Sequence, residues 1–270
     1  MDFILVGPGR AGMSLSLRFL DGRHTISGVL AREPAAAETA ADRLGSRPLR
    51  WDEELPAADL LLMAVSDDAI TEVAERLASC VSGIGGAVHL SGLTPVGAIQ
   101  ALRGPTLGSF HPLQTLPTPE AGTARLEGAW VAVTTNDRDF CDRLFRLATS
   151  IGMHPFRLDD AAKPLYHAAA AASANYPLAA LSIAERLFEA AGVPFEVAGP
   201  LVSAAVSNAM SMGPVAALTG PIARGDVGTV RAQIAVIEQE EPDLVAPFKA
   251  FGRVTAAAAG TADVMESVLE

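Results

Sequence analysis

The stretch FILVGPGRAG at residues 3–12 decides the fold of the first half of the chain. Its four leading apolar residues indicate a short strand, and the glycines that follow have the spacing G-x-G-x-x-G. In such a turn the first glycine permits the tight bend, the second lets a pyrophosphate approach the backbone, and the third lets the next helix pack on the strand. Free N–H groups at the helix N-terminus attract the anion. We therefore predict a dinucleotide-binding turn formed by Gly7, Pro8, Gly9, Arg10, Ala11 and Gly12.

The remainder of the first half repeats this alternation of short apolar runs and amphipathic stretches. Helix start signals occur at Asp67, at Thr94 followed by Pro95, and at Asn136. The pattern predicts an α/β Rossmann-like domain, a doubly wound parallel sheet with helices on both faces. The expected strands are residues 3–6, 26–30, 60–65, 87–90, 106–110 and 130–134.

The second half has a different composition. From about residue 159 the chain is rich in alanine and has few β-branched runs. Asp159 and Asp160 favour a helix N-terminus, and the helical pattern continues to about Ala191. We predict two domains, which a chain of 270 residues has room for: a dinucleotide-binding domain over residues 1–157 and an all-α domain for substrate binding and dimerisation over residues 158–270.

Composition argues against several classes of function. The 20 basic and 31 acidic residues give a net charge of −11, and both halves are acidic, so nucleic acids and anionic membranes are poor partners. No apolar run approaches the roughly 20 residues of a membrane-spanning helix, and the first residues lack the charged leader of a signal peptide. Cys80 and Cys141 lie far apart, which fits a reducing compartment, so we expect a cytoplasmic protein. The five histidines are dispersed, and no metal site is expected.

Residues near two strand ends bear on the choice of cofactor. An NAD-selective site carries an acidic residue about 20 residues beyond the glycine turn, at the end of the second strand. Here that strand is followed by Arg32, whose guanidinium can pair with a 2′-phosphate, so we predict NADP, with NAD as the alternative. Glu33 argues the other way, because its carboxylate would repel that phosphate. Val65 and Ser66 follow the third apolar run and are also expected at the cofactor, since ligands of such sheets bind at the carboxyl ends of the strands.

Three further places suit the recognition of a small substrate. Ser91 and Gly92 offer a hydroxyl and a backbone N–H to a carboxylate, unless they form an ordinary turn. His111 stands at a strand end before a proline and suits a polar contact or a proton donor, although most single histidines are structural. Arg224 could clamp a carboxylate with its guanidinium, or pair with Asp226 to fix a turn.

The start of the long helix holds the candidates for proton transfer. Lys163, Tyr166 and His167 lie within about one turn, and Lys163 and His167 share a face at the spacing i, i+4. Reduction of a carbonyl needs a proton for its oxygen, which Lys, His or an activated Tyr can supply while Asn175 holds the oxygen. Asn175 is offset from His167 by about 80° around an ideal helix. Lys163 is one of two lysines beside 18 arginines, yet it could equally be a surface charge.

Six groups of residues carry a resemblance to a known family: residues 7–12, 64–67, 89–92 and 110–114, then Tyr166-His167 with Asn175, and Thr219-Gly220-Pro221 with Arg224-Gly225-Asp226. They resemble the two-domain oxidoreductases of the 6-phosphogluconate-dehydrogenase-like superfamily. More narrowly, the chain resembles bacterial members that pair a Rossmann-like domain with an uncharacterised C-terminal helical domain. The resemblance implies an NADP-linked enzyme and a homodimer built through the helical domain, and it fixes no substrate.

Relatives within that superfamily give partial guidance on the chemistry. Residues 167–178 are similar to the helix of ketopantoate reductases, with His167 where those enzymes carry a catalytic lysine and Asn175 where they carry an asparagine. For that reason we favour His167 over Lys163 as the proton donor. His111-Pro112 is similar to the histidine-proline pair of prephenate dehydrogenases, and the layout is similar to that of pyrroline-carboxylate reductases.

These observations support one main hypothesis and two alternatives. The main hypothesis is an NADP-dependent oxidoreductase that reduces a small carboxylate-bearing ketone, with 2-dehydropantoate (ketopantoate) as the first substrate to test. One alternative is a cyclic imine reductase of the pyrroline-carboxylate type. The other is a non-catalytic regulatory protein that senses NADP(H).

Overall fold

The computed structural model describes residues 1–51 and 53–270. Its contacts divide the chain into two compact units, Met1–Ala171 and Ala172–Glu270. The division falls inside helix α6 (Lys163–Ala190), later than the domain boundary expected after residue 157. Tyr166 in the first turn of that helix contacts two strand residues of the sheet, His111 and Phe156. Each unit is described below by itself.

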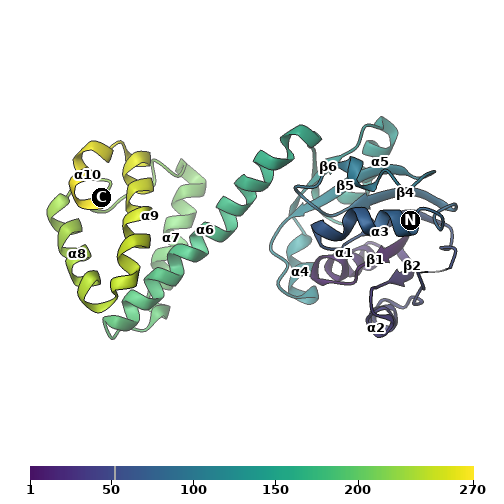
Figure 1. Ribbon diagram of the computed structural model, residues 1–270, viewed down its shortest axis with the longest axis horizontal. Coiled ribbons are helices and arrows are strands. Elements are labelled where there is room, and N and C mark those ends of the chain that lie inside the picture. Colours follow the sequence, from purple (N-terminus) through teal and green to yellow (C-terminus); the bar gives the residue numbers. More distant parts are fainter. Residues whose placement is uncertain (52) are drawn as a thin grey trace. The chain divides into compact units, whose positions relative to one another are not determined.

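The first unit is built on a seven-stranded sheet of order β2-β1-β3-β4-β5-β6-β7 (Figure 1). The strand order reverses at β1, so the crevice beside β1 and β3 is where ligands of such sheets bind. The strands are β1 (Asp2–Val6), β2 (Thr25–Leu30), β3 (Ala58–Met63), β4 (Ile84–His89), β5 (Thr106–Leu113), β6 (Trp130–Thr134) and β7 (His154–Arg157).

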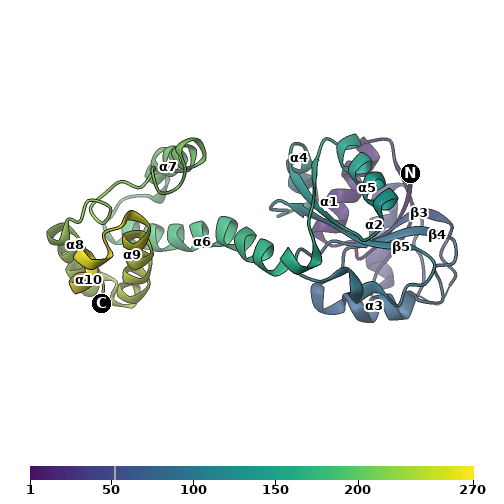
Figure 2. The same ribbon diagram turned by 90° about the horizontal axis from the view of Figure 1, so that it is seen from above.

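Helices cover both faces of this sheet, which confirms the predicted α/β class (Figure 2). Alternate residues of β1 enter two separate cores: Phe3 and Leu5 pack with α1 and α5 on one face, and Ile4 and Val6 pack with α3 on the other. The helices of this unit are α1 (Arg10–Asp21), α2 (Pro34–Leu44), α3 (Ile70–Leu77), α4 (Pro119–Leu126) and α5 (Arg138–Ser150), with 3₁₀ turns η1 (Asp67–Ala69), η2 (Val96–Ile99) and η3 (Asp160–Ala162).

The expectation of a wholly parallel sheet was wrong for its last two strands. The first five strands are parallel, but β6 pairs antiparallel with β5, and β7 pairs parallel with β6. The β5–β6 connection places the start of β6 at the end of β5: Leu113 pairs with Trp130. Strand β7 was not among the predicted strands, because its four residues are too few to form a clear apolar run.

Two predicted helix starts were also wrong. The Thr94-Pro95 signal leads only to the short turn η2, because Gly97 lies within it and Gly104, with φ +106°, lies soon after it. Helix α5 is capped by Asp137 rather than Asn136, since the Asp137 carboxylate accepts a hydrogen bond of 2.7 Å from the Phe140 N–H.

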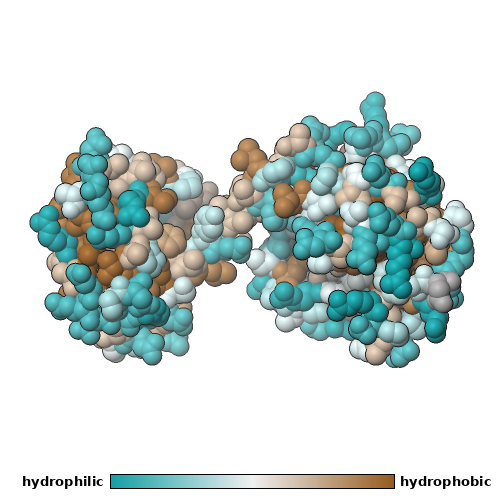
Figure 3. All heavy atoms as spheres, viewed as in Figure 1, coloured by the Kyte–Doolittle hydropathy of each residue, from teal (hydrophilic) through white to brown (hydrophobic). Residues whose placement is uncertain are grey.

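The second unit contains helices alone, as predicted. It comprises the later turns of α6, then η4 (Phe195–Ala198), α7 (Gly199–Met212), α8 (Val227–Glu240), η5 (Pro242–Leu244), α9 (Val245–Ala259) and α10 (Ala262–Leu269). Its small core joins α8, α9 and α10 through Val230, Ala256 and Met265. Helix α7 buries none of its residues, and apolar surface appears in brown on this unit in Figure 3. Among the described residues, the structure holds no helix with the length and apolar character that crossing a bilayer requires.

Candidate functional site

The glycine turn has the geometry that its spacing predicts. Gly7 adopts φ +89°, and its N–H donates to the Leu30 carbonyl at 2.8 Å. A methyl group on Gly12 would lie 2.5 Å from the Gly7 carbonyl oxygen, so this glycine is required for packing. Gly9 differs, because no atom lies within 4 Å of the place where its methyl group would be. The turn therefore leaves an open approach to the backbone at Gly9.

Helix α1 begins directly after this opening and suits an anion. Gly9 occupies its N-cap position, no side chain caps the first turn, and no acidic residue lies in that turn. The N–H groups at the start of the helix therefore remain available. The residues present fit the diphosphate of a dinucleotide.

A cavity of about 560 Å³ runs along one side of the turn. It lies at the carboxyl ends of β1, β2 and β3, where the strand order reverses. The expected cofactor residues Arg32, Val65 and Ser66 all line it with the glycine turn. The full lining is Val6, Gly7, Pro8, Gly9, Ala31, Arg32, Glu33, Ala36, Trp51, Val65, Ser66, Ala69, Glu72, Val73 and Arg76.

Sequence reasoning missed two residues of this cavity, Trp51 and Arg76. The Trp51 indole N–H donates to the Ala31 carbonyl at 2.8 Å, which fixes the ring beside the end of β2. The Arg76 guanidinium stacks on that ring at 4.3 Å from its centroid. Arg32 is 91% exposed and lies 3.6 Å from Glu33. No motif in the sequence marks Trp51, because it belongs to an irregular connection.

A second, separate cavity of about 530 Å³ adjoins the start of α1. Arg10 and Ala11 line it from the start of α1, and His111 lines it from β5. The remaining lining residues are Leu90, Pro112, Gln114, Thr115, Leu116 and Pro117. The predicted cofactor residues thus divide between two cavities, since Gly7 to Gly9 line the first, and Arg10 and Ala11 line the second.

His111 is held firmly at the edge of the second cavity. Its Nδ1 lies 2.8 Å from the Tyr166 hydroxyl, and the two rings meet edge to face at 5.5 Å. Its ring also packs against Gly92, where an added methyl group would lie 2.7 Å from Cε1, and its centroid is 6.3 Å from that of His167. Burial, and then the neighbouring His167, lower the pKa of His111 to about 4. The imidazole is therefore neutral at physiological pH.

Ser91 links its own loop to the turn η1 that follows β3. Its hydroxyl donates to the Asp67 carboxylate at 2.7 Å and accepts from the N–H groups of Leu93 and Thr94 at 3.1 and 2.9 Å. The expectation that Asp67 caps a helix was wrong, because no side chain caps η1 and this carboxylate binds Ser91 instead. Ser91 is 6% exposed, so its contacts position the loop that carries Gly92.

Lys163 is buried rather than a surface charge, with 1% of the residue exposed. Its ammonium donates to the Thr94 carbonyl at 2.7 Å and lies 3.2 Å from an Asp160 carboxylate oxygen. Both Asp160 oxygens accept from the Val96 N–H at 3.1 Å. Burial lowers the pKa of Lys163, and Asp160 partly offsets that effect. The lysine thereby ties the start of α6 to the loop after β4.

His89 lies at the end of β4 near this lysine and is fully buried. Its Nδ1 accepts the Ser91 N–H at 3.2 Å. Burial, with a smaller contribution from the Lys163 charge, lowers the pKa of His89 to about 3. The ring is therefore neutral in the folded protein at neutral pH.

Asn175 and Arg224 belong to the second unit, where both are exposed. Asn175 lies on α6, and Arg224 lies in the turn before α8. The Asp226 carboxylate caps α8, since it accepts from the Thr229 N–H at 3.1 Å and from its hydroxyl at 2.7 Å.

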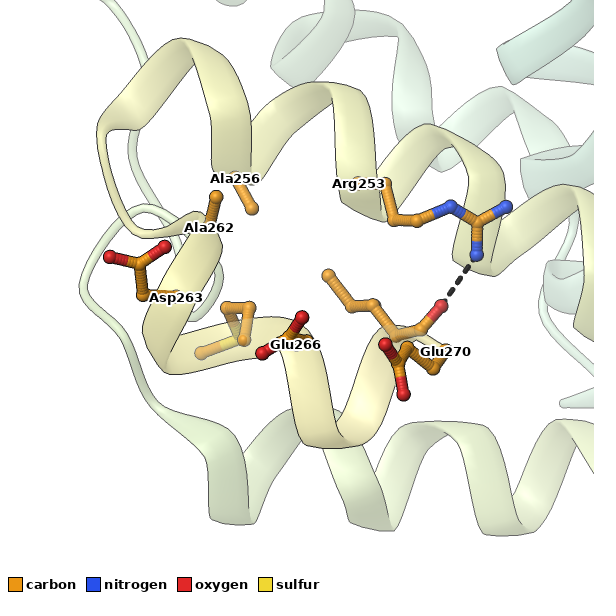
Figure 4. A pocket seen from close by; sticks show the side chains of 8 residues that line it. Arg253, Ala256, Ala262, Asp263, Glu266 and Glu270 are labelled. Carbon is orange, nitrogen blue, oxygen red and sulfur yellow. Dashed lines mark hydrogen bonds between the residues drawn. The ribbon is translucent and has the colours of Figure 1, made fainter.

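A smaller cavity of about 260 Å³ lies between α9 and α10 in the second unit (Figure 4). Arg253 lines this cavity, and its guanidinium donates to the Leu269 carbonyl. The carboxylates of Asp263, Glu266 and Glu270 also line the cavity. An excess of negative charge makes this cavity a poor receptor for a carboxylate substrate.

The fold and the glycine turn define the class of this protein as a two-domain α/β protein with a dinucleotide-binding type of N-terminal domain. Residues 2–112 match the Rossmann-like domain family, and residues 129–255 match DUF2520, a domain of unknown function. The chain thus carries a Rossmann-like domain in its first half and a DUF2520 domain in its second half, which confirms the pairing that the sequence resemblance implied. No curated protein matches it in sequence.

Solved structures with the same fold extend over nearly the whole chain. A Bacteroides fragilis protein described provisionally as an NADP oxidoreductase has a TM-score of 0.82 at 19% identity, covering 95% of this chain and 98% of that chain. An imine reductase from Streptomyces aurantiacus has a TM-score of 0.69 at 19% identity, with both chains fully covered. An imine reductase from Myxococcus stipitatus, solved in complex with NADP⁺, has a TM-score of 0.65 at 15% identity, again with full coverage. At these identities the likeness is one of fold.

Proposed function

We propose that this protein is an NADP-dependent oxidoreductase that acts on a small substrate. The observation that carries the proposal is the open approach at Gly9, placed at the N-terminus of α1 with one cavity lined by Gly7 to Gly9 and a second lined by Arg10 and Ala11. A dinucleotide needs this arrangement, because its diphosphate must meet backbone N–H groups while its two ends occupy separate places. The descriptions of the Bacteroides and Myxococcus proteins support the proposal.

The first cavity suits the adenosine end of NADP. Arg32 and Arg76 place two guanidinium groups in its lining, and a guanidinium can bind a phosphate through two hydrogen bonds. Glu33 and Glu72 line the same cavity and oppose this preference. We propose that the two arginines bind the 2′-phosphate.

The second cavity suits the nicotinamide end and a small substrate. When bound, the nicotinamide supplies a hydride. Arg10 offers a guanidinium for a substrate carboxylate, and His111 offers a ring nitrogen beside it. We propose a carboxylate-bearing ketone as the substrate class, with ketopantoate tested first and cyclic imines such as pyrroline carboxylates tested alongside.

Calorimetric titration with NADPH and NADH tests the cofactor. We expect tighter binding of NADPH, and we expect Arg32→Gln and Arg76→Gln each to weaken NADPH about tenfold, the loss of one charge-assisted contact, while NADH is unaffected. Arg43→Gln is the matched control, because Arg43 pairs with Glu120 and does not line the cavity. Tighter binding of NADH would overturn the 2′-phosphate assignment.

Turnover is tested by following NADPH absorbance with a panel of 2-keto acids and cyclic imines. Oxidation of NADPH above background with a ketone or an imine supports the oxidoreductase and selects between the two substrate classes. If NADPH binds and no compound is reduced, the enzyme assignment fails and a sensor of NADP(H) becomes the better description.

A further inference from the structure

The contact between His111 and Tyr166 joins two distant parts of the chain at the edge of the second cavity. The residues are 55 positions apart in sequence, on β5 and on the first turn of α6. Phe156 of β7 packs against the Tyr166 ring at 5.9 Å, and Gly92 packs against the His111 ring. Each of the two rings is therefore held by the other and by one further neighbour, Phe156 for Tyr166 and Gly92 for His111.

The direction of their hydrogen bond follows from what else each group contacts. The Tyr166 hydroxyl is half-buried, and His111 Nδ1 is its partner among the described residues. Buried hydroxyl protons take an acceptor where one is in reach, and the neutral imidazole of His111 offers one lone pair. With the hydroxyl donating to Nδ1, the imidazole proton resides on Nε2.

We propose that His111 delivers the proton to the substrate from Nε2, and that Tyr166 acts through His111 by replacing that proton at Nδ1. This inference rests on the proposed oxidoreductase function. His111 is then the catalytic residue, because it lines the cavity, and Tyr166 is a positioning residue that sets its tautomer. Lys163, which is occupied by Thr94 and Asp160, takes no part in the transfer.

The proton balance is closed by the two residues and water. As the carbonyl carbon is reduced, its oxygen becomes basic and takes the proton from Nε2. Nδ1 takes the hydroxyl proton of Tyr166, so His111 remains neutral throughout and changes only its tautomer. After the product leaves, Nε2 takes a proton from solvent and Nδ1 returns its proton to the Tyr166 oxygen, which restores the starting tautomer. An alkoxide is a stronger base than a tyrosinate, even though burial raises the pKa of Tyr166 to about 12.

The charges around His111 agree with a neutral relay. Burial, His167 and Lys163 lower the pKa of the His111 imidazole, and Asp67 raises it by less. An imidazolium at this position would lose its acceptor at Nδ1 and could not take the Tyr166 proton. The relay therefore operates over the whole range in which His111 is neutral.

A direct test is the ¹⁵N NMR spectrum of the histidine side chains in the full-length protein, with His111 assigned by its loss in His111→Gln. We expect the Nε2–H tautomer between pH 6 and 8 in the wild type, and a changed Nδ1 resonance in Tyr166→Phe. An Nδ1–H tautomer, or an imidazolium at pH 7, overturns the relay whatever the substrate.

Kinetics with a substrate from the panel give a second, independent arm. Tyr166→Phe should lower kcat about 100-fold, the lower end of what a positioned proton donor supplies, with KM and the NADPH dissociation constant unchanged. Tyr176→Phe makes the same change at an exposed tyrosine of the second unit and should leave kcat as in the wild type. An unchanged kcat in Tyr166→Phe contradicts the relay alone, whereas a wild type that binds NADPH and reduces no compound contradicts the proposed function.

Discussion

Gly9 and Gly12 belong to one motif, yet the atoms around them differ, and so does the reason for a glycine at each position. An added methyl group at Gly12 meets the Gly7 carbonyl oxygen at 2.5 Å and the Ala64 side chain at 2.8 Å. At Gly9 the same group meets nothing within 4 Å. Packing therefore requires a glycine at position 12, whereas the fold does not require one at position 9.

This difference predicts opposite effects for two substitutions of one kind. Gly12→Ala should destabilise the protein by about 1–3 kcal/mol, because backbone or buried side chains must shift. Gly9→Ala should cost less than about 1 kcal/mol, since its backbone is in an ordinary extended conformation, but should weaken NADPH at least about tenfold. Thermal unfolding and calorimetry measure the two effects. Loss of affinity without loss of stability in Gly12→Ala would contradict this division.

The buried His89 makes stability depend on pH. Its pKa is about 3 in the folded protein against 6.5 for an ordinary histidine, so the unfolded chain binds the extra proton. The free energy of unfolding should therefore fall as pH drops from about 6.5 toward 3, by about 1.4 kcal/mol per pH unit for this one group.

Urea unfolding of the wild type and of His89→Gln over this pH window measures that slope. In the variant, the change in the free energy of unfolding with pH should be smaller by the contribution of about one proton, whatever its absolute stability. The matched control is His154→Gln, at an exposed histidine in β7. Equal slopes in the wild type and His89→Gln would show that His89 is not the titrating group.

At the scale of elements, sequence patterns predict what is local. Strand β1, the glycine turn and α1 are contiguous, and so are the helical turns of α6, so spacing alone places them. The antiparallel direction of β6 depends on pairing with β5, and the burial of Lys163 depends on the loop after β4. The partnership of His111 with Tyr166 is equally non-local, and no periodicity encodes it.

Lys163 illustrates the limit of spacing and yields a prediction. Its position one turn before His167 made it a candidate for proton transfer. Its hydrogen bond to the Thr94 carbonyl indicates instead that it connects α6 to the loop after β4. Lys163→Met should destabilise the first unit by roughly 1–3 kcal/mol, because the partly buried Thr94 carbonyl loses its donor while the partly exposed Asp160 is rehydrated. NADPH affinity should remain. A variant with full stability and no turnover would restore Lys163 as a catalytic candidate.

At the scale of the whole molecule, the apolar surface of α7 stands out. Its exposed residues include Leu201, Val206 and Met210, although the helix is among the most apolar of the chain. Monomers rarely leave such a surface open to water. We propose that a second copy of this chain covers α7, as the resemblance to dimeric reductases implied.

Light scattering on the purified protein tests this assembly. We expect a dimer in the wild type and a monomer, or a much weaker dimer, in the double variant Leu201→Glu and Met210→Glu. Glu238→Lys alters an exposed position of α8 and serves as the control. A monomeric wild type at micromolar concentration would contradict the proposal.

The presence of two separate cavities at one glycine turn has a practical consequence. Under the proposed assignment of the adenosine end, an affinity resin bearing immobilised adenosine 2′,5′-bisphosphate would occupy the first cavity and leave the second open. The protein could then be captured from extract together with any small metabolite lodged beside His111. Elution followed by mass spectrometry would show which small molecules the protein carries, and these become the first candidates for its substrate.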